Sequence, residues 1–217
     1  MDGDTHDPHR IATTAQLREL YREPTQLVID KVRPELDAAT QRYLSLARVL
    51  FVGSHAADGS VDVSPRGGEA GFVQVLDAHR LAIADLGGNN RIDTLRNVVE
   101  TGWLGLLAVI PGRPETVRVA GRAHVTTDPD VLARFPLSRV PKTAIVVDVV
   151  STFIHCGKAF LRGEVWEPEV WSQVDPDAPD AADIVVCQGI ATVDAATVRA
   201  ALADGYAAEL AAERAPG

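Results

Sequence analysis

Three short segments of the chain carry residues whose types and spacing could bind an anion. In the first, Val63-Ser64-Pro65-Arg66-Gly67-Gly68, an arginine ends an apolar strand and two glycines follow it. A guanidinium forms bidentate hydrogen bonds with phosphate, and glycine allows a ligand to approach the backbone closely. The segment therefore predicts a phosphate contact. A hairpin with a surface arginine is the alternative interpretation.

The second segment, Asp85-Leu86-Gly87-Gly88-Asn89-Asn90-Arg91, lies directly before a predicted helix at 92–99. We expect Asn89 or Asn90 to cap this helix, so that further N–H groups face outward with the positive end of the helix dipole. Arg91 falls in the first turn, where a cation is unfavourable unless an anion is bound nearby. An ordinary glycine-rich turn with an asparagine cap is the alternative.

The third segment is Phe153-Ile154-His155-Cys156-Gly157-Lys158-Ala159. His155 and Cys156 are adjacent, and adjacent residues of a strand point to opposite faces, so the pair does not favour a metal site or a Cys–His nucleophile. Lys158 follows a strand that could end at a pocket. A solvated lysine is the alternative interpretation.

Composition limits the classes of partner. The 217 residues carry 30 acidic and 21 basic side chains, and the net charge of −9 opposes a broad nucleic-acid-binding surface. The first residues are acidic where a secretion signal would be basic, and no apolar run approaches the roughly 18 residues of a membrane span. We therefore expect a cytoplasmic protein that binds a small molecule and neither nucleic acid nor a membrane.

The elements that must position these segments are mainly strands. Period-two patterns and short turns, such as Asp58-Gly59, favour an antiparallel β-barrel with flanking helices over a layered parallel sheet. The predicted strands are 48–53, 61–64, 72–76, 80–84, 102–110, 116–126 and 143–153, with helices near 91–100 and 129–135.

Helices are predicted at both ends of the chain. Residues 1–47 read as a leader and three short helices, the first opened by a capping box of Thr13 and Gln16. Residues 48–165 form the predicted barrel domain, and 166–217 form an extension of the same structural unit. An alanine-rich helix at 193–214 has an apolar edge that we expect either to cover the barrel or to form a dimer contact.

The three segments, in this order and spacing, resemble the pyridoxamine 5′-phosphate oxidase-like flavoproteins. The resemblance is greatest to a branch of FMN-dependent enzymes without an assigned substrate, and it covers about 48–168. It is carried by four runs: Ser64-Pro65-Arg66-Gly67, Gly88 to Asn97, Ile110 to Ala123, and His155-Cys156-Gly157-Lys158-Ala159.

This resemblance implies a split β-barrel of Greek-key character that forms a homodimer with FMN at the subunit interface. It also implies a role for each matching position. Ser64, Pro65, Arg66 and Gly67 would contact the phosphate side or the flavin edge, and the backbone of Ala84 and Asp85 would meet the flavin. Asn89, Asn90 and Arg91 would clamp the phosphate, Thr116 and Arg118 would reach the isoalloxazine ring, and Lys158 would reach the cofactor from the partner subunit.

The function implied is an FMN-dependent oxidoreductase that transfers hydride or electrons to or from a small substrate. The chain has no Arg-x-His after Lys158 to match the parent oxidase, so pyridoxamine 5′-phosphate oxidation itself is not expected. Two alternatives stay open. One is a flavin-binding protein without turnover, for storage or sensing. The other is a barrel that holds haem, with His155 as ligand, or a deazaflavin.

Overall fold

The computed structural model describes residues 7–171 and 177–214. The chain divides into two compact units, the first ending at Val32 and the second beginning at Arg33. The first unit contains α1 (Thr14–Leu20) and α2 (Gln26–Asp30). The predicted capping box is confirmed, because the Thr13 hydroxyl accepts from the Gln16 backbone N–H while the Gln16 side chain accepts from the Thr13 N–H.

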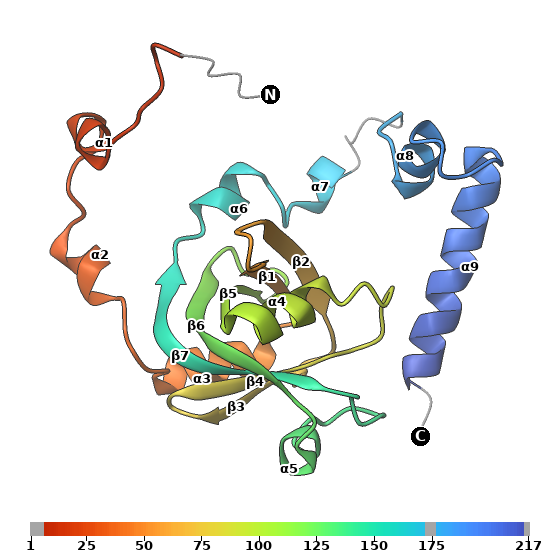
Figure 1. Ribbon diagram of the computed structural model, residues 1–217, viewed down its shortest axis with the longest axis horizontal. Helices are drawn as coiled ribbons and strands as arrows, with labels where there is room; N and C mark the ends of the chain where they lie inside the picture. Colours follow the sequence, from red (N-terminus) through yellow and green to blue (C-terminus); the bar gives the residue numbers. More distant parts are fainter. Residues whose placement is uncertain (1–6, 172–176, 215–217) are drawn as a thin grey trace. The chain divides into compact units, whose positions relative to one another are not determined.

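The second unit is built on a single seven-stranded antiparallel sheet with the order β2-β1-β5-β6-β7-β4-β3 (Figure 1). All seven predicted strands are present, and the predicted fold, an antiparallel split barrel with flanking helices, is confirmed. The strands are β1 (Val49–His55), β2 (Val61–Gly67), β3 (Val73–Asp77), β4 (Arg80–Ala84), β5 (Trp103–Val109), β6 (Thr116–Thr126) and β7 (Ala144–His155).

Local chemistry explains where the strands turn and bend. Gly59 of the predicted Asp-Gly turn has φ of +86°, a conformation that favours glycine, and it joins β1 to β2. The long β6–β7 pair contains a register shift between Ala120 and Gly121. A Cβ at Gly121 would lie 2.1 Å from the Asp148 carbonyl oxygen, so only glycine lets the two strands approach this closely.

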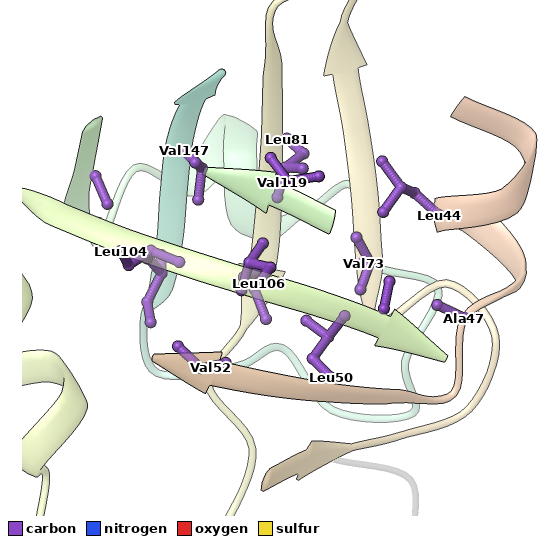
Figure 2. Packing of buried hydrophobic residues seen from close by; sticks show 14 of the residues in the cluster. Leu44, Ala47, Leu50, Val52, Val73, Leu81, Leu104, Leu106, Val119 and Val147 are labelled. Atoms are coloured by element: carbon purple, nitrogen blue, oxygen red, sulfur yellow. The ribbon is translucent and has the colours of Figure 1, made fainter. Parts of the chain in front are cut away.

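The core lies inside the curved sheet (Figure 2). Alternate residues of β1, such as Leu50 and Val52, point inward and are completely buried. Each such aliphatic side chain contributes about 1.5–3 kcal/mol by leaving water. Their partners in the figure come from six other elements: Leu44 and Ala47 of the α3 region, Val73, Leu81, Leu104 and Leu106, Val119 and Val147.

Seven helices accompany the sheet among the described residues of the second unit. The first of them, α3, begins after Asp37, whose carboxylate accepts the Thr40 backbone N–H at 2.9 Å. That backbone hydrogen bond lowers the pKa of Asp37 below its usual value. The helices are α3 (Ala38–Leu46), α4 (Asp93–Thr101), α5 (Pro129–Leu132), α6 (Lys158–Arg162), α7 (Pro168–Trp171), α8 (Ala181–Cys187) and α9 (Ala195–Arg214).

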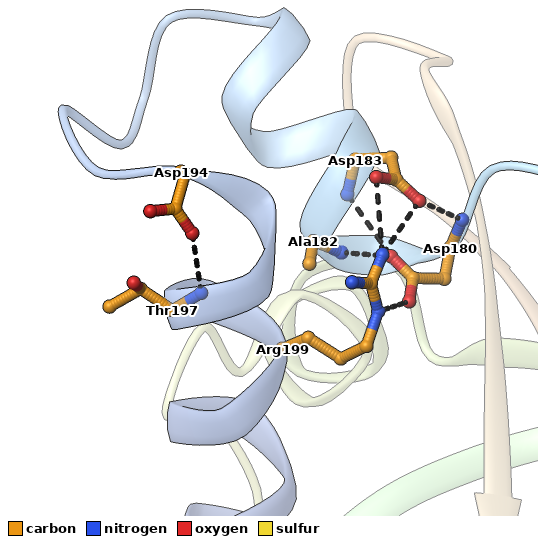
Figure 3. A network of polar contacts seen from close by, with 6 residues as sticks. All are labelled: Asp180, Ala182, Asp183, Asp194, Thr197 and Arg199. Atoms are coloured by element: carbon orange, nitrogen blue, oxygen red, sulfur yellow. Dashed lines mark hydrogen bonds and ion pairs between the residues drawn. The ribbon is translucent and has the colours of Figure 1, made fainter.

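Helices α8 and α9 are joined by a charged network centred on Arg199 (Figure 3). Its guanidinium donates to the carboxylates of Asp180 and Asp183. The hydrogen bond from Arg199 is the main reason that the pKa of Asp180 lies well below its usual value. Further along α9, Tyr206 and Leu210 are exposed, so the predicted role of the apolar edge stays a prediction.

Within the described ranges, no helix combines the length and the apolar character needed to span a membrane.

Candidate functional site

A cavity of about 950 Å³ lies where the end of β2, the segment after β4, the start of α4, the α5–β7 connection and the C-terminal end of α9 meet. Nine of the twelve predicted site residues line it. They are Ser64, Pro65, Arg66, Gly67, Ala84, Asp85, Asn89, Asn90 and Arg91. Two segments separated by a β-hairpin in the sequence therefore face the same space.

Arg66 and Asp85 form an ion pair at this cavity. The distance from Arg66 Nη1 to Asp85 Oδ1 is 2.6 Å, and the two side chains are only 18% and 23% exposed. Arg66 Nε is buried and has no acceptor among the described residues. A buried donor without a partner costs about 1–3 kcal/mol, so the guanidinium retains hydrogen-bonding capacity that a ligand could use.

The Asn89-Asn90-Arg91 segment differs from its predicted form. The prediction that Asn89 or Asn90 caps the helix was wrong: α4 begins at Asp93, and its N-cap residue is Ile92, which makes no side-chain cap bond. The side chain of Asn89 accepts the Arg91 backbone N–H instead, at 3.1 Å. The chain therefore closes a local turn before the helix starts, and Arg91 precedes the first turn instead of lying in it.

Two backbone conformations mark this segment as unusual. Asn90 and Ile92 have φ of 59° and 53°, in the left-handed region that non-glycine residues rarely adopt. For a β-branched residue such as Ile92 this conformation is costly, of the order of 1–3 kcal/mol, and such residues gather at functional sites. The side chain of Arg91 is 75% exposed, and its Nε donates to Asp93 at 2.8 Å.

Sequence reasoning missed four basic residues of the cavity, one of which, Arg214, lies at the end of α9. Arg48 lies directly before β1, while Arg139 and Lys142 lie on the α5–β7 connection. Within the described part of the chain, none of these last three has an ion-pair partner. The only local signal was a pair of cations between Leu137 and Thr143, because nothing in the sequence indicates that this connection returns to the second strand.

Apolar side chains line other parts of the cavity, and four further carboxylates also line it, those of Asp62, Glu69, Asp93 and Glu213. Phe72 and Leu86 contribute from the two sides of the β3–β4 hairpin, and Leu137 contributes from the α5–β7 connection. Gly68 lies against Phe72: a Cβ at Gly68 would be 2.8 Å from the Phe72 side chain. The close packing at Gly68 therefore depends on the absence of a side chain there.

The other three predicted residues do not line this cavity. Arg118 lines a separate shallow depression of about 290 Å³ on the sheet, together with Phe51 and His155. Thr116 is buried in the β6–β7 ladder opposite His155. Lys158 is exposed at the start of α6. Within one chain, nine of the predicted cofactor contacts thus lie at the cavity and three lie away from it.

Residues 36–153 match the family model for pyridoxamine 5′-phosphate oxidase, which is more than half of the chain. The chain belongs to the pyridoxamine 5′-phosphate oxidase family. The predicted resemblance to this family is therefore confirmed.

The solved structures to which this chain is similar align with little more than half of its length. HupZ of Group A Streptococcus is 16% identical, with 54% of this chain and 92% of that chain covered and a TM-score of 0.43. A putative pyridoxamine 5′-phosphate oxidase of Lactobacillus delbrueckii is 22% identical, with 56% and 95% covered and a TM-score of 0.43. A related FMN-binding protein of Nostoc punctiforme is 14% identical, with 52% and 75% covered and a TM-score of 0.38. No curated protein matches the chain.

Proposed function

We propose that this protein is a homodimeric FMN-dependent oxidoreductase acting on a small substrate. One observation carries the proposal: in a chain of this family, nine residues from two segments that resemble its cofactor-binding runs line one cavity. At about 950 Å³, the cavity is near the upper end of the range for small-molecule sites, which leaves room for a substrate beside a cofactor.

One group of basic residues at the cavity supports an anionic cofactor. FMN carries a dianionic phosphate, which is costly to bury without cations and donors. Arg91 and the amides of Asn89 and Asn90 supply these on one side of the cavity, and Arg139 and Lys142 supply further positive charge from the α5–β7 connection. We assign the phosphate to this group of residues.

The other walls support a flat ring system. Phe72, Leu86 and Leu137 offer apolar surface, and Arg66 offers donors beside it. A flavin, when bound, supplies hydride or electron transfer, so the protein itself needs to bind, orient and shield the reactants. No group on the chain has to act as the acid or base of that transfer.

The remaining predicted contacts support a second copy of the chain. Arg118 and Lys158 are exposed away from the cavity, so in this proposal they meet the cofactor of a partner subunit, whereas the buried Thr116 offers no side-chain surface for such a contact. The sheet near Arg118 exposes apolar side chains, since Phe51 of β1 is 41% exposed and Val63 of β2 is 66% exposed. Exposed apolar surface of this kind is typical of an interaction site.

The first test is the purified protein itself. We expect a flavin absorbance spectrum, a dimeric mass by light scattering, and reduction and reoxidation of the flavin with some donor and acceptor. A haem spectrum would contradict the proposal, and a bound flavin that no donor reduces would favour the storage or sensing alternative.

The second test separates the phosphate contacts from the ring contacts. Arg91→Ala should weaken FMN binding by about tenfold to a hundredfold, the range for a hydrogen bond to a charged group, and leave riboflavin binding unchanged. Arg96→Ala is the matched control, because Arg96 also pairs with Asp93, at 3.0 Å, but does not line the cavity. Unchanged FMN affinity in Arg91→Ala would show that the phosphate lies elsewhere.

A further inference from the structure

The Arg66–Asp85 pair differs in chemistry from the other charged groups of the cavity. Its two side chains are at least three-quarters covered, whereas Arg91 is 75% exposed. The pair has no net charge. It also keeps unused hydrogen-bonding groups of both kinds, because Arg66 Nε has no acceptor and Asp85 Oδ2 has no donor among the described residues.

A dianionic phosphate suits this pair poorly. Arg66 would attract it, but the Asp85 carboxylate, bonded to the same guanidinium, would repel it. A neutral group that presents an acceptor beside a donor suits the pair well, because the guanidinium can donate to the acceptor while the carboxylate accepts from the donor. The imide edge of a flavin ring has this pattern, with one N–H between two carbonyl groups.

We propose that the Arg66–Asp85 pair binds the imide edge of the flavin, while the Asn89-Asn90-Arg91 segment binds the phosphate. This inference rests on the proposed flavin-binding function and divides the site into a ring end and a phosphate end. Asp85 then has two roles: it holds Arg66 in place through Nη1, and its carboxylate accepts from the ring N–H.

The neighbours of the pair support this division. Pro65, Ala84 and Leu86, which are next to the pair in sequence, also line the cavity and present apolar surface to a flat ring. Arg91, six residues after Asp85, lies on the exposed segment before α4, where a phosphate keeps part of its hydration. The covered pair and the exposed arginine thus suit different parts of one ligand.

A purely structural role is the competing explanation for the pair. Arg66 belongs to β2 and Asp85 directly follows β4, and these two strands are not neighbours in the sheet. The bond could therefore serve only to hold the two strands together. The test needs a measurement that such a role would not change.

The test compares four ligands by titration under equilibrium conditions: FMN, riboflavin, and the same two flavins methylated at the ring N3. We expect the wild-type protein to bind each methylated flavin about tenfold more weakly than its parent, because methylation removes the N–H that Asp85 accepts. Asp85→Ala should weaken FMN and riboflavin by the same factor, about tenfold, and should no longer distinguish methylated from unmethylated flavin.

Two further variants make the result decisive. Asp77→Ala is the matched control, because it breaks an exposed Arg–Asp pair, with Asp77 Oδ2 2.8 Å from Arg80 Nε, outside the cavity. It should leave all four affinities unchanged. If Asp85→Ala does not fold, Asp85→Asn keeps the side-chain volume and should reduce the preference for unmethylated flavin.

The contradicting outcomes are distinct. Loss of FMN binding in Asp85→Ala with riboflavin binding spared would place the pair at the phosphate. An unchanged preference for unmethylated flavin in Asp85→Ala would show that the pair only holds the two strands together and does not contact the ring N–H. Either result overturns this inference and leaves the flavin-binding proposal standing. A wild-type protein that binds no flavin overturns the proposed function itself.

Discussion

The ion pair between Arg66 and Asp85 makes a measurable contribution to stability that can be worked out from its burial. Exposed ion pairs contribute about 0–1 kcal/mol, and breaking a fully buried pair costs about 3–5 kcal/mol. With side chains 18% and 23% exposed and 2.6 Å between Nη1 and Oδ1, this pair lies between the two limits. We expect a coupling free energy of about 2 kcal/mol between the two residues.

A double-mutant cycle measures this coupling. Arg66→Ala, Asp85→Ala and the double variant are unfolded in urea without added flavin, and the free energies of unfolding are compared with that of the wild type. Each single variant leaves a charge without its partner, so the double variant should be less destabilised than the sum of the two. A coupling below about 0.5 kcal/mol would refute the reasoning, since additive changes mean that the side chains do not interact.

The cycle has a control in the same sheet. Asp77 and Arg80 form an Arg–Asp pair whose side chains are 41% and 53% exposed. Water screens such a pair, so its coupling should be clearly smaller than that of the covered pair. Equal couplings for the two pairs would show that burial does not determine their strength.

Two further predictions concern the scaffold. In urea unfolding, Gly121→Ala should lower the free energy of unfolding by about 1–3 kcal/mol or more, because the new Cβ would lie 2.1 Å from the Asp148 carbonyl oxygen. Gly105→Ala is the control and should have little effect, because a Cβ at Gly105 would have no atom within 4 Å. Arg199→Ala should loosen α8 from α9 at neutral pH, seen as faster amide exchange in both helices; equal exchange rates would contradict this. Because Arg199 lowers the pKa of Asp180, the wild-type contact contributes fully above the unfolded pKa of about 3.9 and is lost as the pH falls below it; this dependence should be weaker in the variant, where only the Asp183 hydrogen bonds still lower that pKa.

Several parts of the fold could be predicted because they depend on neighbouring residues. The alternation of apolar residues in 116–126 predicted β6 with both ends correct, and the Asp-Gly pair predicted the β1–β2 turn. The capping box at Thr13 is likewise a matter of side chains three residues apart. In each case the interactions that decide the structure lie within a few residues of chain.

The prediction for the N-cap residue of α4 failed for a reason that is also physical. Asparagine is a strong N-cap residue, and two of them precede the helix. In the folded chain, Asn89 bonds within its own turn, and Ile92 takes the cap position in a left-handed conformation. The local preference of asparagine for the N-cap was therefore not decisive, although Ile92 itself is 59% exposed.

The amino-acid sequence by itself determined the seven strands, their antiparallel class and the segments that carry the candidate chemistry, because periodicity and turn propensity act over short distances. Only the tertiary structure decided which side chains meet. The pairing of Arg66 with Asp85, the arrival of Arg139 and Lys142 at the same cavity, and the separation of Arg118 from it depend on the sheet order β2-β1-β5-β6-β7-β4-β3 and on how that sheet folds in space to bring β2 near the end of β4. That order is set by the burial of residues far apart in the chain, and no local pattern encodes it.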